Sequence, residues 1–371
     1  MGAKWLGVVT AFIICYIGYA WIDRFDQKFV RGKRVLVTGA SAGIGESVAY
    51  HYARMGATVL VSARREALLK KVVAKCQELS GGKEHYYITS DMSKLEDTEN
   101  VIKAAETMLG GLDILVLNHI APYTMGYWTG RDNLTTINYK TTVNFLSYVH
   151  LFSHALPLLR KSPGSSVVVV SSLLAWCAQK LISLCHDTLP KPRWSCTTEA
   201  QLRFKHIGLS FIEATIQALD DCANFHLIPY LFTHLTSFLG SPVQSDYAAT
   251  KFAINGFFTS LRGEFHLQED DISITICYLG PIATKMGLAI LANRGTFGPK
   301  VFEDMVLMDQ DEAALAVVKS AAIKENELYY PYLIKLCTFP GMKELAIRMS
   351  YSGFKQAVEN TKYNRYVHSG K

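Results

Sequence analysis

The segment RVLVTGASAGIG at residues 34–45 contains the features that decide the fold. Its apolar start predicts a buried strand, and Gly39, Gly43 and Gly45 follow at the spacing G-x-x-x-G-x-G. Residues 46–55 then suit a helix. Glycines let a backbone approach a pyrophosphate closely, and the N-terminal end of a helix attracts its negative charge. The segment therefore predicts a strand–turn–helix unit that binds a nucleotide, although three glycines by themselves also occur in ordinary loops.

A second apolar run, at residues 58–61, predicts the next strand and ends in Ser62-Ala-Arg64-Arg65. Dinucleotide-binding folds contact the adenosine ribose at this position, and an acidic residue there favours NAD. Arg64 and Arg65 are instead suited to pair with a 2′-phosphate. We therefore expect NADP(H) as the cofactor; the alternative is that both arginines are solvated charges at a strand end.

Apolar runs alternate with helical stretches from residue 32 to residue 172, which is typical of an α/β fold with a doubly wound parallel sheet. Further strands are expected at residues 86–89, 112–117, 166–170 and 272–278. Ligands of such sheets bind beyond the carboxyl ends of the strands. Asp91 and Met92 are then expected near the adenine, although a helix N-cap explains Asp91 equally well. Asn118 is expected to brace neighbouring strands, and His119 to be a packed or hydrogen-bonded side chain with no evident partner.

The N-terminus carries an apolar segment without charges, residues 5–22, just long enough to span a bilayer core. Bulky side chains near its end and its aromatic residues favour an uncleaved anchor over a cleaved signal peptide. The basic residues that follow the segment would place the rest of the chain in the cytosol by charge counting. The net charge of +6 over 371 residues is modest and the basic residues are scattered, so nucleic-acid binding is not expected.

Much further along, Tyr247 and Lys251 open a predicted helix and lie four residues apart on one face. A tyrosine ordinarily titrates near pH ~10 and is a poor base at neutrality. An ammonium close to the phenol favours its ionised form. The pair is therefore suited to exchange a proton with a substrate alcohol or carbonyl.

The glycine turn, Asn118, Ser172 and the Tyr247–Lys251 pair together resemble the signature of the short-chain dehydrogenase/reductase family. The segments LVLNHI at 115–120, VNFLSYV at 143–149, VVSSL at 169–173 and KFA at 251–253 narrow the resemblance to its 11β-hydroxysteroid dehydrogenase group. The order along the chain, with the apolar segment first, then a short linker and then the dinucleotide unit, also resembles that group. The resemblance implies a Rossmann fold and hydride transfer between NADP(H) and a secondary alcohol or ketone of a hydroxysteroid.

The resemblance also implies a catalytic tetrad of Asn144, Ser172, Tyr247 and Lys251. Tyr247 would be the acid/base, Lys251 would lower its pKa and bind the nicotinamide ribose, and Ser172 would hold the substrate oxygen. Asn144 would support a proton relay; Asn138 competes for this role, but the VNFLSYV match favours Asn144. Taken singly, Ser172 could merely end a strand and Asn144 could be an ordinary polar helix residue.

The implied cofactor contacts are Gly39, Ser41, Ala42, Gly43, Ile44, Gly45, Arg64, Arg65, Asp91, Met92, Asn118, Tyr247, Lys251, Pro281, Ile282 and Thr284. Ala42 departs from the group, which usually has a basic residue there, so the preference for NADP rests more heavily on Arg64, with Arg65 as a second candidate.

The second departure is larger, because 75 positions separate Ser172 from Tyr247. Loops longer than ~12–15 residues without structure of their own are uncommon. The extra segment, about residues 179–240, has cysteines and histidines but none of the tight spacings of a metal site, so no metal is expected. It is either a lid or membrane-docking flap, or an insertion that does not fold properly, from unusual splicing or a gene-model error. The second reading is favoured because the flanks match the family closely, and it leaves open a catalytically impaired protein that only binds cofactor or steroid.

We therefore expect three parts: residues 1–31 as membrane anchor and linker, 32–300 as the Rossmann catalytic domain with its insertion, and 301–371 as a C-terminal helical extension. The resemblance implies an apolar small-molecule substrate, a homodimer and contact with the lipid bilayer. It also implies an endoplasmic reticulum membrane protein with a luminal catalytic domain, whereas the charge count places that domain in the cytosol. The alternative is secretion after signal cleavage. A sequon at Asn133 would be glycosylated only if it faces the lumen.

Overall fold

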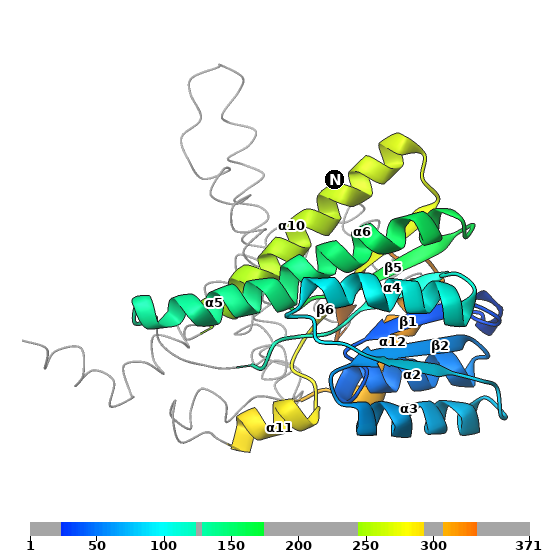
Figure 1. Ribbon diagram of the computed structural model, residues 1–371, viewed down its shortest axis with the longest axis horizontal. Helices are drawn as coiled ribbons and strands as arrows, with labels where there is room; N and C mark the ends of the chain where they lie inside the picture. The colour runs from blue at the N-terminus through cyan, green and yellow to red at the C-terminus, as the bar shows by residue number, and fades with distance from the viewer. Residues whose placement is uncertain (1–23, 124–127, 174–243, 293–306, 332–371) are drawn as a thin grey trace, which may run out of the picture.

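The computed structural model describes residues 24–123, 128–173, 244–292 and 307–331 (Figure 1). Its centre is a seven-stranded sheet in the order β3-β2-β1-β4-β5-β6-β7, with all neighbours parallel. The strands are β1 (Arg34–Thr38), β2 (Thr58–Ala63), β3 (Tyr86–Thr89), β4 (Ile114–Leu117), β5 (Ser165–Val170), β6 (Ile272–Leu279) and β7 (Glu327–Tyr330). The strand order reverses between β1 and β4, which is where doubly wound sheets open a crevice for a ligand. The predicted fold class is thus confirmed for the sheet.

Helices cover both faces of the sheet (Figure 1). They are α2 (Gly43–Arg54), α3 (Glu66–Leu79) and α12 (Gln310–Ala322) on one face, and α4 (Leu95–Leu109), α6 (Ser147–Arg160) and α10 (Ser245–Gln268) on the other. Shorter elements are η1 (Gln27–Phe29), η2 (Arg131–Asn133), α5 (Leu134–Thr141), the π-helix η3 (Thr142–Leu146) and α11 (Lys285–Ala292).

The strands alternate their side chains between two apolar cores. In β1, Leu36 packs under α4 and α6, while Val35 and Val37 pack under α2 and α12. Every residue of β4 and β5 is buried. Parallel strands covered on both faces have this near-continuous apolar character.

Several predicted segments lie outside the described residues: the apolar segment 5–22, the insertion at about 179–240, and residues 332–371. Within the part of the chain that the structure describes, no helix is long and apolar enough to cross a bilayer. In the region expected as a helical extension, α12 and β7 complete the sheet and one of its layers, because β7 pairs with β6. The described part of residues 301–371 is therefore continuous with the Rossmann unit.

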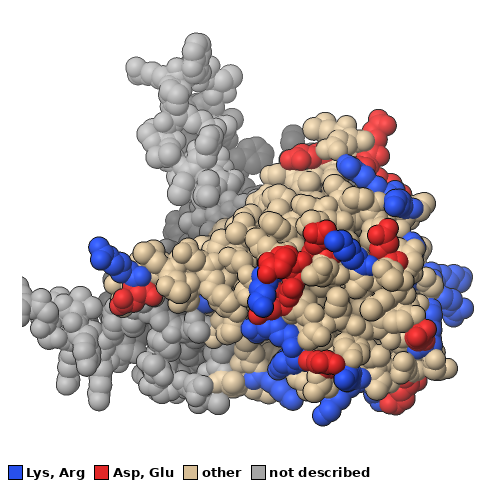
Figure 2. Space-filling model, viewed as in Figure 1, with Lys and Arg blue, Asp and Glu red and all other residues tan. Residues whose placement is uncertain are grey.

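Charged side chains of both signs lie interspersed on the visible face, with uncharged surface between them (Figure 2). The basic residues that are scattered in the sequence therefore also remain scattered over this face of the fold.

Candidate active site

The glycine turn connects β1 to α2 at the carboxyl edge of the sheet. Gly39 and Gly43 both have a φ of +66°, a conformation that side chains with a Cβ rarely adopt. A Cβ on Gly39 would lie 2.6 Å from the Cα of His119, and one on Gly45 would collide with the Nδ2 of Asn118. The turn therefore has no room for a side chain at Gly39 or Gly45.

Asn118 fastens this turn to the end of β4. Its Nδ2 donates to the carbonyl oxygens of Thr38 and Gly39, at 3.1 and 3.4 Å. Its own N–H donates to the Oγ1 of Thr38 at 3.0 Å. Asn118 thus braces two adjacent strands where the sheet order reverses.

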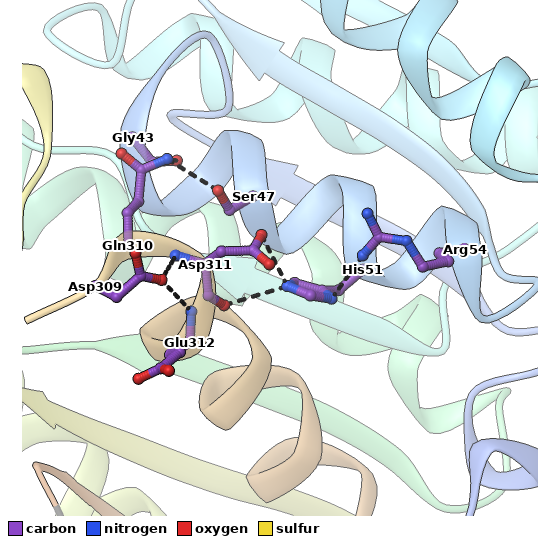
Figure 3. Close-up of polar contacts among 8 residues, drawn as sticks. All are labelled: Gly43, Ser47, His51, Arg54, Asp309, Gln310, Asp311 and Glu312. Carbon is purple, nitrogen blue, oxygen red and sulfur yellow. Dashed lines mark hydrogen bonds and ion pairs between the residues drawn. The ribbon is translucent and has the colours of Figure 1, made fainter.

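Helix α12 contacts the glycine turn through its first residue, Gln310 (Figure 3). The Nε2 of Gln310 donates to the carbonyl oxygen of Gly43 at 3.2 Å and to the Oγ of Ser47 at 2.9 Å. Further along, the Nε2 of His51 lies 3.1 Å from the Oδ1 of Asp311. The sequence analysis did not single out Gln310, because this contact joins residues far apart in the chain and no local motif signals it.

The two arginines at the end of β2 differ in their surroundings. Arg65 donates from Nε and from one terminal guanidinium nitrogen to the Oγ of Ser41, at 3.2 and 2.8 Å. Arg64 instead donates to the hydroxyl of Tyr139 at 3.5 Å, and both arginines are exposed. Ser41 belongs to the glycine turn, so Arg65 is held beside it with donors left to bind an anion.

Asp91 follows β3 and closes a local turn. Its Oδ1 accepts from the N–H and the Oγ of Ser93, at 3.0 and 2.9 Å. Although burial favours the protonated carboxyl, these hydrogen bonds hold the pKa of Asp91 below its ordinary value. The N-cap of α4 is Lys94, so the alternative role of Asp91 as this N-cap is not what the structure shows. Met92 is buried in the core.

The loop after β6 also borders the glycine turn. Met308 donates its N–H to the carbonyl oxygen of Pro281 at 2.9 Å, and Ile282 forms a bridge with Met308. The Oγ1 of Thr284 accepts from the N–H of Gly287 at 3.0 Å and so begins α11. A Cβ built on Gly43 would lie 3.4 Å from the Cγ2 of Thr284, which puts this loop against the turn.

Tyr247, Lys251 and Ser172 are brought together although 75 positions separate Ser172 from Tyr247. The side chains of Ser172 and Tyr247 share a hydrogen bond. Lys251 donates from Nζ to the carbonyl oxygen of Val170, the last residue of β5, at 2.9 Å. The Nζ lies 5.9 Å from the centroid of the Tyr247 ring. The first turns of α10 thus meet the end of β5 at the ligand-binding edge of the sheet.

Asn144 lies in the π-helix η3 and is 1 % exposed. Its Oδ1 accepts from the N–H of Ala121 at 2.7 Å, and its Nδ2 donates to the Oγ1 of Thr250 at 3.1 Å. Thr250 in turn donates to the carbonyl oxygen of Tyr247 at 2.8 Å. Asn144 therefore links the loop after β4 to α10. Its π-helical turn is of a kind that is frequent at functional sites.

Burial controls the titration of the two central groups. It raises the pKa of Tyr247 to about 12, against the opposing effect of the hydrogen bond with Ser172. It lowers the pKa of Lys251 to about 7. The lowering of the tyrosine pKa that we expected from Lys251 is therefore not seen in this structure, because desolvation disfavours the phenolate and only the hydrogen bond with Ser172 opposes it. At neutral pH Tyr247 is protonated and able to donate its proton.

His119 is a structural residue. Its Nδ1 lies 2.9 Å from the Oγ1 of Thr38 and its Nε2 lies 2.7 Å from the Oγ of Ser147. Burial, together with the nearby Lys251, lowers the pKa of His119 to about 3, so the ring is neutral. The packed and hydrogen-bonded side chain expected from the sequence is what the structure shows, with two partners that the sequence did not reveal.

Tyr123 is a further residue of the site that the sequence analysis missed. Its ring meets that of Tyr247 edge-on, with centroids 5.2 Å apart and planes at 76°. Edge-to-face pairs are a favoured aromatic geometry. Tyr123 follows β4 without any motif of its own, so its proximity to Tyr247 appears only in the fold.

Comparisons with known proteins agree with this geometry. The short chain dehydrogenase family profile matches residues 33–183. A hydroxysteroid 11-beta-dehydrogenase 1-like protein of Danio rerio is 34 % identical over 351 residues, which cover 93 % of this chain and 96 % of that protein. The chain belongs to the short-chain dehydrogenase family. A protein of the same name from Xenopus tropicalis is 37 % identical over 88 % of this chain and 90 % of its own length.

A solved short-chain dehydrogenase of Shigella flexneri, complexed with NADP, has the same fold. Its TM-score is 0.56 at 20 % identity, over 82 % of this chain and 98 % of that one. In dinucleotide-binding folds a glycine turn between the first strand and the first helix receives the pyrophosphate. The close-packed glycines, and the anchored Arg65 beside them, fit such a ligand.

Proposed function

We propose that this short-chain dehydrogenase interconverts a secondary alcohol and a ketone on a hydroxysteroid, with NADP(H) as its cofactor. The observation that carries the proposal is the Ser172–Tyr247 hydrogen bond, with Lys251 beside it at the carboxyl edge of the sheet. The relatives named hydroxysteroid 11-beta-dehydrogenase 1-like proteins support a steroid as substrate. The alternative, a protein that binds cofactor or steroid without turnover, is favoured only by the long separation of Ser172 and Tyr247.

The preference for NADP(H) is supported by charge at the end of β2. Arg65 is held against Ser41 of the glycine turn, and Arg64 lies next to it. Together they offer several N–H donors to a 2′-phosphate, and the region has no acid in the position that would favour NAD. The NADP bound to the Shigella flexneri protein is in line with this proposal.

In the proposed reduction, the side chains act on the carbonyl oxygen of the substrate. Tyr247 donates its phenolic proton to that oxygen, and Ser172 donates a hydrogen bond to it. The ammonium of Lys251 stabilises the tyrosinate that is left. The nicotinamide cofactor supplies the hydride, or accepts it in the reverse direction. In oxidation, Tyr247 accepts the alcohol proton and Lys251 again favours the ionised phenol.

The test is the conversion of 11-keto and 11-hydroxy steroids with NADPH and NADP by the full chain, beside a version without residues 179–240 and a Tyr247→Phe control. We expect the full chain and the shortened version to convert the steroids, and the Tyr247→Phe control not to convert them. NADPH binding without turnover by either would instead support the binding protein. Turnover by the shortened version alone would show that the insertion disables the enzyme, whereas failure of NADPH binding would reject both proposals.

We also propose a position in the endoplasmic reticulum membrane with a luminal catalytic domain, and a homodimer. The support is the apolar segment 5–22 and the likeness to the 11β-hydroxysteroid dehydrogenase group. Glycosylation of Asn133 in microsomes, lost in Asn133→Gln, is the expected result. Complete digestion of the domain by protease added outside sealed microsomes would reject this orientation.

A further inference from the structure

Lys140 and Asp246 form a nearly buried ion pair beside the catalytic tetrad. The Nζ of Lys140 lies 2.6 Å from the Oδ2 of Asp246. The two side chains are 3 % and 17 % exposed. Charged groups are rarely buried to this extent unless they are paired, because leaving water is costly for each of them.

The pair joins the two elements that carry most of the tetrad. Lys140 lies near the end of α5, which continues directly into η3 and Asn144. Asp246 is the second residue of α10 and precedes Tyr247. The Oδ1 of Asp246 accepts from the N–H of Tyr247 at 2.6 Å. The carboxylate is therefore bonded on one side to α5 and on the other to the backbone of the catalytic tyrosine.

A second contact runs beside the ion pair, because Asn144 donates to Thr250 and Thr250 donates to the carbonyl oxygen of Tyr247. Both the N–H and the carbonyl of Tyr247 are thus fixed by side chains that lead to α5 and η3. Gln244, at the N-cap of α10, makes no side-chain cap hydrogen bond, so the first turn has no conventional N-terminal cap.

Ser172 follows β5 and Tyr247 lies in α10, 75 positions further along the chain, so neighbouring backbone geometry does not align the two residues. Tertiary contacts must supply the alignment. We propose that the Lys140–Asp246 pair is a positioning device, which sets the first turn of α10 against η3 so that the Tyr247 hydroxyl meets Ser172. This inference rests on the proposed oxidoreductase function and goes beyond it.

The experiment compares Lys140→Met with the neutral double variant Lys140→Met/Asp246→Asn in the full chain. The asparagine keeps an oxygen for the N–H of Tyr247, and removing both charges avoids an unpaired buried carboxylate. The matched control is Lys103→Met, which breaks an ion pair of 2.7 Å with Glu99 on the exposed face of α4. The readouts are amide hydrogen exchange over residues 245–251, thermal stability, NADPH affinity, and kcat and KM for the steroid.

In Lys140→Met we expect faster exchange over residues 245–251 and a kcat reduced roughly 10- to 100-fold, because small misalignments of a reacting group are costly. NADPH affinity and KM should change much less than kcat, because the glycine turn is not touched and only the contacts of Tyr247 and Lys251 lie in the loosened turn. The double variant should recover the melting temperature but keep the fast exchange and the low kcat. The Lys103→Met control should match the parent.

Unchanged exchange in Lys140→Met, or a double variant with the kcat and exchange of the parent, would overturn the inference, because the pair would then only balance charge. The exchange readout does not depend on turnover. A parent chain that binds no NADPH would therefore reject the proposed function while the exchange data still decide the role of the pair.

Discussion

The glycine turn takes its geometry from one contiguous stretch, residues 34–45, whereas the catalytic tetrad comes from η3, the end of β5 and α10, which lie far apart in the chain. The geometry of the turn depends on the lack of side chains, since a Cβ on Gly39 or Gly45 would collide with the residues after β4. In the tetrad, alignment depends on polar contacts between elements, such as those of Asn144 and Asp246. The proposed nucleotide site is therefore a local property of the sequence, and the proposed catalytic site is a property of the packed fold.

The largest effect on activity is expected in the catalytic tetrad. Tyr247→Phe keeps the ring and its edge-on contact with Tyr123 but removes the proton donor, so kcat should fall roughly 100- to 10,000-fold, the usual contribution of a general acid. NADPH affinity should change far less, because the glycine turn is intact and only the contact of the Tyr247 hydroxyl with the cofactor is lost. Steady-state kinetics and NADPH fluorescence titration measure the two quantities. Tyr123→Phe is the matched control, and an equal loss of kcat in that variant would contradict the assignment of Tyr247 as the acid.

The next largest effect is expected from Gly45→Ala, which changes the glycine turn. The added methyl would meet the Nδ2 of Asn118 and lie 2.8 Å from the carbonyl oxygen of Gly39, which is a backbone atom. We expect a loss of about 1–3 kcal/mol in the free energy of unfolding, as for overpacked sites. NADPH affinity should fall on the order of 100-fold, because the backbone that receives the pyrophosphate is displaced.

Gly263→Ala in α10 is the matched control, because a Cβ there meets no atom within 4 Å. In a helix interior this change should raise the free energy of unfolding by about 0.5–1 kcal/mol. Chemical denaturation and isothermal titration with NADPH compare the two variants. Equal NADPH affinity in both would show that the turn tolerates a side chain and does not approach the cofactor closely.

These two regions also mark how much of the molecule can be predicted from its sequence. The sheet, the glycine turn and the four tetrad residues follow from contiguous motifs and from the family resemblance, since strands buried on both faces are continuous apolar runs. The raised pKa of Tyr247 could not be predicted, because it depends on how much of the phenol is buried by elements distant in sequence. The same holds for the partner of Asp246, since nothing local to Lys140 signals an ion pair with a residue 106 positions away.

The third prediction distinguishes the two arginines after β2. Arg65→Ala removes the guanidinium that Ser41 holds, and a charge-assisted hydrogen bond is worth about 1.5–3 kcal/mol, so NADPH affinity should fall roughly 10- to 100-fold. NADH affinity should change little, because NADH has no 2′-phosphate. Arg64→Ala, made beside it, should have the smaller effect because its side chain is not fixed to the turn. If NADPH and NADH affinities fall equally, Arg65 supports the fold of the turn rather than binding the phosphate.

The smallest effect is expected behind the turn, at Gln310. Its amide donates to the carbonyl oxygen of Gly43 and to Ser47, so Gln310→Ala removes a support of the turn without touching the surface that faces the cofactor (Figure 3). A neutral hydrogen bond is worth about 1 kcal/mol, which corresponds to roughly a fivefold loss of NADPH affinity with kcat unchanged. Asp311→Asn, which weakens the neighbouring contact with His51 but leaves Gly43 alone, should bind NADPH like the parent. If Asp311→Asn lost as much affinity as Gln310→Ala, the packing of α12 against α2 as a whole, and not the single bond to Gly43, would hold the turn in place.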